Sequence, residues 1–103
     1  LNHVREQGQK LQTALLDLCR KTGLFSQVRG MGLLLGCVLD EAYRGRASEI
    51  TAAALKHGVM ILVAGADVLR FAPSLLLNDE DMAEGLRRLE HALTEFAATS
   101  DNP

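Results

Sequence analysis

The chain has 103 residues, of which 48% are apolar and 23% are charged, and its formal net charge is −2. This composition is typical of a single globular domain and excludes an intrinsically disordered segment. The slight acidic excess and the 4% share of aromatic residues argue against nucleic acid as a partner, because such domains carry basic patches and stacking platforms.

Several features bear on the compartment. No uncharged apolar run approaches the roughly 18 residues that a membrane helix needs, so no membrane partner is expected. The two cysteines, Cys19 and Cys37, lack metal or redox spacing and are predicted to be reduced thiols of a cytoplasmic protein. The chain starts with Leu1 and not with Met, in a stretch that already looks helical, and we therefore expect it to be part of a longer polypeptide.

The first half of the chain predicts one helix and two strands. Apolar residues at spacings of seven, four and three predict an amphipathic helix over residues 4–21, with Gly23 as its C-terminal stop. Residues 25–28 can begin a strand, and the apolar run at 33–39 predicts a buried strand. The intervening pair Gly30 and Gly32 favours a bend or bulge.

The second half continues with a helix and two further strands. Residues 46–57 form a helical pattern that is predicted to stop at Gly58. Its face would be thin, because alanines dominate the apolar stripe of Ala47, Ile50, Thr51, Ala54 and Leu55. Strands are predicted at 59–63 and 68–71. The four residues between them, 64–67, are too few for a parallel crossover, which favours antiparallel pairing.

A last helix is predicted to start after Asn78 as its N-cap. The acidic residues at 79–81 lie where the helix dipole favours negative charge, which explains them without a metal site. Residues 99–103 are expected to be a frayed tail. The apolar stripe of this helix consists of Met82, Leu86, Leu89, Leu93 and Phe96.

Together these elements predict an α+β fold in which a three- to four-stranded, mostly antiparallel sheet is covered on one face by helices. No internal linker or repeat divides the chain, so residues 1–103 are expected to form one domain.

Most motifs for chemistry are absent or weak. The spacing Gly30-x-Gly32-x-x-x-Gly36 departs from the dinucleotide fingerprint and precedes a strand instead of a helix, which favours a structural role. No nucleophile motif is present. The histidines are far apart in the sequence and lack metal-ligand spacing, so no metal site is predicted. They are His3, His57 and His91.

Arg70 stands out because it interrupts an apolar strand between Leu69 and Phe71. A buried guanidinium without a partner is very costly, so this side chain must either face outward or meet an anion. Its planar fork suits a carboxylate. The pattern alone favours the outward arginine and leaves the anion site open.

Two longer segments carry a resemblance to a known family. Gly-Leu-Phe-Ser-Gln-Val-Arg-Gly-Met-Gly-Leu-Leu-Leu-Gly at 23–36 resembles the opening of the C-terminal small domain of subgroup III aminotransferases, which are PLP-dependent enzymes of fold type I. The segments at 57–65 and 68–75, the latter reading Val-Leu-Arg-Phe-Ala-Pro-Ser-Leu, resemble the acetylornithine and succinylornithine aminotransferase branch. The resemblance covers nearly the whole chain.

The resemblance implies a role for Arg70. In such enzymes the arginine of the Arg-Phe-Ala-Pro motif binds the α-carboxylate of the substrate. The implied parent reaction moves the amino group of N-acetylornithine or N-succinylornithine to 2-oxoglutarate, giving glutamate, with pyridoxal phosphate as cofactor. The parent would be a cytoplasmic homodimer of arginine metabolism, joined through its large PLP-binding domain.

The same resemblance implies that this chain lacks the catalytic machinery. The family's Schiff-base lysine, its aspartate facing the cofactor ring and its phosphate-binding loop belong to the large domain. The lysines here, Lys10, Lys21 and Lys56, have no matching context. No catalytic or cofactor-binding residue is therefore expected, and the chain alone should be inactive and free of PLP.

Two hypotheses from other functional classes remain open. The chain could be a stand-alone α+β module in which Arg70 holds a free amino acid, or a structural dimerisation domain.

Overall fold

A computed structural model of the chain describes residues 2–31, 34–65, 67–71 and 79–100. Its strands form one four-stranded sheet with the order β1-β2-β4-β3, and every neighbouring pair is antiparallel. The predicted α+β fold is confirmed. The elements in chain order are α1 (Asn2–Thr22), β1 (Phe25–Met31), β2 (Leu34–Leu39), the short 3-10 helix η1 (Glu41–Tyr43), α2 (Ala47–Lys56), β3 (Ile61–Val63), β4 (Val68–Phe71) and α3 (Asp79–Ser100).

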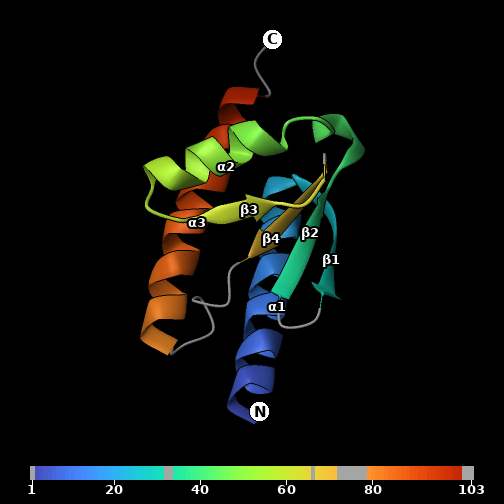
Figure 1. The fold of residues 1–103 in the computed structure, drawn as a ribbon. Helices are drawn as coiled ribbons and strands as arrows, with labels where there is room; N and C mark the ends of the chain where they lie inside the picture. Colours follow the sequence, from blue (N-terminus) through green and yellow to red (C-terminus); the bar gives the residue numbers. More distant parts are fainter. Residues whose placement is uncertain (1, 32–33, 66, 72–78, 101–103) are drawn as a thin grey trace.

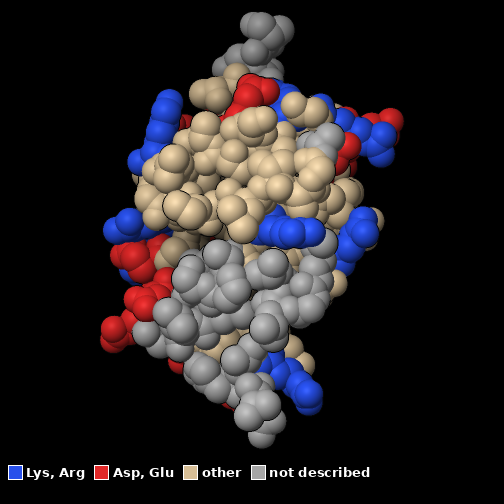
Figure 2. All heavy atoms as spheres, viewed as in Figure 1, with Lys and Arg blue, Asp and Glu red and all other residues tan. Residues whose placement is uncertain are grey.

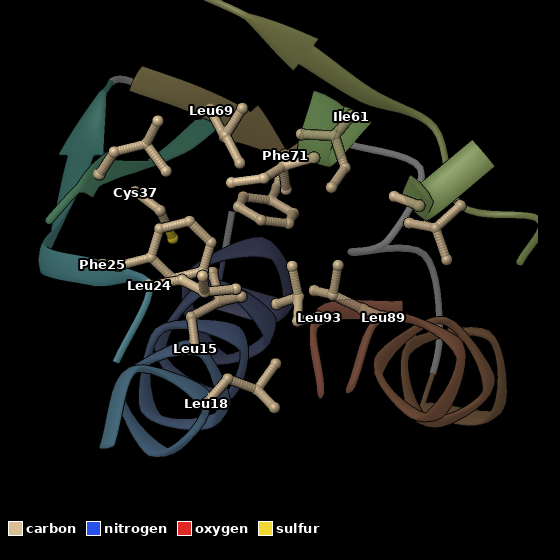
Figure 3. Close-up of a cluster of buried hydrophobic side chains, with 14 of the residues drawn as sticks. Leu15, Leu18, Leu24, Phe25, Cys37, Ile61, Leu69, Phe71, Leu89 and Leu93 are labelled. Atoms are coloured by element: carbon tan, nitrogen blue, oxygen red, sulfur yellow. The ribbon is translucent and has the colours of Figure 1, made fainter. Parts of the chain in front are cut away.

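The helices lie on one side of the sheet. In Figure 1 the strands are drawn in front of α1 and α3, and Figure 3 shows the main core between the sheet and these two helices. One continuous hydrophobic cluster joins the layers. Its fully buried large side chains include Leu11, Leu15, Leu24, Leu39, Ile50, Leu69, Phe71, Leu89 and Leu93.

The helices end where the sequence predicts. Gly23 adopts a φ of +70° and donates its N–H to the Cys19 carbonyl at 2.9 Å. Gly58 closes α2 in the same way, with a φ of +82° and an N–H bond of 2.9 Å to the Leu55 carbonyl. Both positions need the left-handed backbone that glycine adopts without a steric penalty.

The packing of α2 corrects one expectation. Ala47, Ile50 and Ala54 are buried, but Leu55, which the apolar spacing places on the same stripe, is 61% exposed. At about 100° per residue, Leu55 lies about 80° to one side of Ala47, whereas Ile50 lies about 60° to the other. The buried arc of this thin helix is therefore centred away from Leu55.

The strands also differ in detail from the prediction. The ladder irregularity falls between Phe25 and Gln27, while Gly30 pairs regularly with Leu35, so the predicted bulge is not at Gly30. The strand predicted from residue 59 starts at Ile61. Its start is delayed because the backbone N–H of residue 59 still bonds to the Ala54 carbonyl at the end of α2.

Turn chemistry and the chain end add two further differences. Asp40 ends the strand as expected, but its carboxylate also accepts the N–H of Ala42 and caps η1, which the apolar periodicity did not predict. Helix α3 continues through Ser100, and the remaining residues of the expected frayed tail, 101–103, lie outside the described residues. The predicted cap Asn78, together with Gly32, lies outside the described residues.

The core gives a direct stability prediction. Leu93 on α3 is fully buried between the sheet and the helices, so Leu93→Ala should lower the free energy of unfolding of this chain by about 2–5 kcal/mol. Leu55→Ala, at an exposed site of α2, should change it by less than about 0.5 kcal/mol. Urea unfolding followed by circular dichroism measures both, and similar effects of the two substitutions would contradict the packing described here.

Candidate functional site

Strand β4 places its side chains alternately on the two faces of the sheet. Leu69 and Phe71 are buried in the core, whereas Val68 and Arg70 are half-buried on the opposite face. Arg70 thus points away from the helix layer, which agrees with the outward orientation that the sequence favours. This face is the candidate site.

The sheet register aligns Arg70 with residues of the other strands. Arg70 lies opposite Gly36 of β2 on one side and opposite Leu62 of β3 on the other, and Gly36 lies opposite Arg29 of β1. The cross-strand row Arg29, Gly36, Arg70 and Leu62 therefore crosses all four strands on the uncovered face.

The Arg70 guanidinium retains an unsatisfied hydrogen-bond donor. Its Nε atom is completely buried and has no hydrogen-bond partner, and within the described residues no carboxylate pairs with this side chain. A buried donor without an acceptor is unfavourable, so the geometry favours an acidic ligand that approaches from the uncovered face. A carboxylate can accept two parallel hydrogen bonds from this fork.

The histidines are closer in space than in the sequence. His57, at the end of α2, and His91 on α3 have ring centroids 4.8 Å apart, and His57 Nε2 lies 3.5 Å from Glu95 Oε2. The sequence could not reveal this pairing because it depends on how α2 packs against α3. In the part of the chain that the structure describes, no three side chains gather as metal ligands.

The cysteines and glycines do not form reactive sites. Cys19 and Cys37 are free thiols, and burial raises the pKa of both. A raised pKa keeps a thiol protonated and unreactive at neutral pH. Gly30 and Gly36 lie in strands and not at a helix N-terminus, so these two residues lack the setting of a dinucleotide fingerprint.

The lysines are not placed to hold a cofactor on this face. Lys10 pairs with Asp79 at 3.1 Å, and Lys21 contacts carboxylates on α1 and α3 at 3.2 and 3.5 Å. Lys56 is exposed in the last turn of α2. All three belong to the helix layer or its connections, so the residues of this chain do not fit covalent attachment of PLP beside Arg70.

Comparison with known proteins agrees with the geometry. Residues 1–93 match the family described as Aminotransferase class-III, and the chain belongs to this family. It is 90% identical over 100 residues to an acetylornithine aminotransferase of Neisseria meningitidis, covering 97% of this chain and 25% of that protein. A succinylornithine transaminase of Yersinia enterocolitica is 45% identical over 89 residues, covering 86% of this chain and 22% of that protein.

A solved structure shows the same fold. The N-acetylornithine aminotransferase from Stenotrophomonas maltophilia K279a superposes with a TM-score of 0.87 at 43% identity, covering 95% of this chain and 27% of that one. The chain thus spans about a quarter of the length of the relatives it matches. Separately, none of the helices in the described ranges has the length and apolar character required to cross a membrane.

Burial of Cys37 predicts a pH dependence of stability. Burial raises the pKa of the Cys37 thiol far above its ordinary value of 9.0, and the neighbouring Cys19 makes a smaller contribution in the same direction. Because the folded protein holds this proton more tightly than the unfolded chain, this contribution to stability is complete below about pH 9 and is lost as the pH rises above it.

The matched variant is Cys37→Ala, which removes the titrating group. It should lower the urea midpoint at pH 7, because it leaves a small cavity, but reduce the fall in stability between pH 9 and about pH 11. An equally steep fall in both proteins would show that the thiol does not cause it.

Proposed function

We propose that this chain is the C-terminal small domain of an N-acylornithine aminotransferase and that Arg70 binds the α-carboxylate of its substrates. The observation that carries the proposal is the buried, unpartnered Nε of Arg70 on the uncovered face of the sheet. The similarity to acetylornithine and succinylornithine aminotransferases supports N-acetylornithine or N-succinylornithine as donor. We infer 2-oxoglutarate as acceptor from the family resemblance of the sequence alone.

The contribution of Arg70 is orientation. Two parallel hydrogen bonds from a guanidinium to a carboxylate fix both the position and the plane of the ligand. Because β4 is anchored by Leu69 and Phe71, the arginine is held by a rigid strand instead of a loop. The binding energy of a non-reacting group is thereby used to align the reacting amine or oxo group.

The rest of the enzyme would supply the cofactor. In the full-length parent, which we expect to be a cytoplasmic homodimer, pyridoxal phosphate acts as an electron sink when it is bound by the large domain. The described lysines of this chain are engaged or exposed away from Arg70, so we expect this chain alone to be inactive.

Substitution of Arg70 in the full-length parent tests the carboxylate site. Arg70→Ala should reduce kcat/KM for N-acetylornithine by at least about 2 kcal/mol of transition-state stabilisation, or about 30-fold, because a charged hydrogen-bonded pair is lost. Arg70→Lys should also be poor, since a point charge cannot reproduce the fork.

A substrate without the carboxylate provides the control. N-Acetyl-1,4-diaminobutane is N-acetylornithine without its carboxylate, so its slow turnover should be nearly the same with Arg70 and with Arg70→Ala. Exposed Arg20 on α1 offers a matched protein control, because Arg20→Gln should leave both substrates unaffected. Unchanged kinetics of Arg70→Ala with N-acetylornithine and 2-oxoglutarate would exclude the assigned role.

A second test concerns the isolated chain. When it is mixed with pyridoxal phosphate, the absorbance band of lysine-bound PLP should be absent, and borohydride reduction should add no cofactor mass. Stable labelling of Lys10, Lys21 or Lys56 would contradict the expectation. Calorimetric binding of free amino acids to this chain would instead favour the stand-alone module.

A further inference from the structure

The two cross-strand neighbours of Arg70 differ in size. On β2 the residue directly opposite is Gly36, and on β3 it is Leu62. Residues directly opposite each other in an antiparallel pair project from the same face of the sheet, with Cβ atoms roughly 5 Å apart. The Arg70 side chain therefore leaves the sheet between an aliphatic side chain on one strand and bare backbone on the other.

Burial shows that this cross-strand row is packed. Gly36 is buried although the helices do not cover its face, and Nε of Arg70 is completely buried. Nε joins the guanidinium to the aliphatic stem, so its burial means that neighbouring atoms enclose the outer end of the stem. Of the two cross-strand partners, Leu62 is the one with a side chain, and it is 48% exposed, so about half of its surface lies against neighbours. A glycine inside a strand often marks the close approach of another group.

The strands offer Arg70 no acidic neighbour. The charged residues of the four strands are Arg29 and Arg70, and none of these strands contains Asp or Glu. Figure 2 shows this side of the molecule, where uncharged side chains fill the middle of the described surface and carboxylates lie at its margin. Within the described sheet, the direction of the Arg70 side chain therefore depends on packing and not on an ion pair.

We propose that Leu62 and Gly36 are positioning residues for Arg70. Leu62 supports the aliphatic stem from β3, because an arginine stem packs readily along apolar surface while its head stays available for polar contacts. Gly36 is the floor on β2 over which the guanidinium lies when it meets the carboxylate of the substrate. This inference rests on the proposed function, in which Arg70 binds that carboxylate.

The size of the support at Leu62 is tested in the full-length protein with two substrates, N-acetylornithine and N-acetyl-1,4-diaminobutane, which lacks the carboxylate. Leu62→Ala should lower the kcat/KM preference for N-acetylornithine by about tenfold, because the guanidinium loses its fixed direction. Leu62→Met, which conserves volume, should keep the preference within about threefold of the parent. An equal loss of kcat/KM with both substrates would show a merely structural role and overturn the proposal for Leu62.

A charged substitution tests whether the side chain at position 62 reaches the guanidinium. Leu62→Glu places a carboxylate opposite Arg70, where it would pair with the guanidinium and compete with the substrate. Leu62→Gln is the matched control, because it has nearly the same shape without the charge. The preference for N-acetylornithine should be at least about tenfold lower with Leu62→Glu than with Leu62→Gln, since a charged hydrogen-bonded pair is at stake. Equal preferences of the two variants would refute the contact.

The floor at Gly36 is tested by adding a methyl group. Gly36→Ala should lower the preference for N-acetylornithine by about fivefold or more, because the methyl group stands where the guanidinium lies. Gly30→Ala is the matched control in a neighbouring strand, since a Cβ at Gly30 would meet no described atom within 4 Å, and it should retain the preference. Turnover of N-acetyl-1,4-diaminobutane shows that each variant is folded, and a folded Gly36→Ala protein with the full preference would exclude Gly36 from this role.

Arg70→Ala, measured alongside, separates this inference from the proposed function. If Arg70→Ala keeps the preference for N-acetylornithine, the proposed function fails, whatever the other variants do. If Arg70→Ala loses the preference while Leu62→Ala, Leu62→Glu and Gly36→Ala all keep it, the carboxylate site stands and only the positioning roles of Leu62 and Gly36 are refuted.

Discussion

The antiparallel register between β2 and β4 determines which face of the sheet Arg70 occupies. It sets Phe71 opposite Leu35 and Leu69 opposite Cys37 on the core side, and so sets Arg70 opposite Gly36 on the other. A slip of one residue would exchange the two faces and place a guanidinium among leucines. Burial of the aromatic and aliphatic neighbours therefore fixes the direction of the arginine more firmly than any contact of the arginine itself.

The helix layer stabilises the pairing of β2 with β4 in this register. The inward side chains of β2 and β4 pack in one hydrophobic cluster with α1, α2 and α3, and that cluster holds the strands as one unit. Gly36 leaves the position directly opposite Arg70 on β2 without a side chain. The fold thus combines a rigid support on one face with an accessible charged group on the other.

Periodicity in the sequence predicts most of this architecture because the core consists of regular apolar stripes. Local sequence chemistry accounts for the apolar stripe of α3 and for the apolar run that forms β2. It also accounts for the helix ends at Gly23 and Gly58. The features that the sequence did not predict depend on contacts between different helices and strands. The exposure of Leu55 reflects the arc of α2 that meets α3 and the sheet, and the site of the ladder irregularity reflects strand pairing.

The candidate site was predictable only in part. The spacing around Arg70 shows that a cation interrupts an apolar strand, and the resemblance suggests a carboxylate ligand for it. The companion Arg29 was not identified, because its relation to Arg70 depends on β1 and β4 both flanking β2. The contact between His57 and His91 is of the same kind, since it joins two helices that the sequence does not orient.

Among the residues that the structure describes, none is an acidic partner of Arg70, and this absence is itself informative. An acidic side chain within the domain would satisfy the buried Nε, but it would also compete with an incoming carboxylate and weaken its binding. A binding arginine must therefore be held in place by something other than its own ion pair. Here the packed strand provides that support, so the guanidinium can keep unused hydrogen-bonding capacity for a ligand.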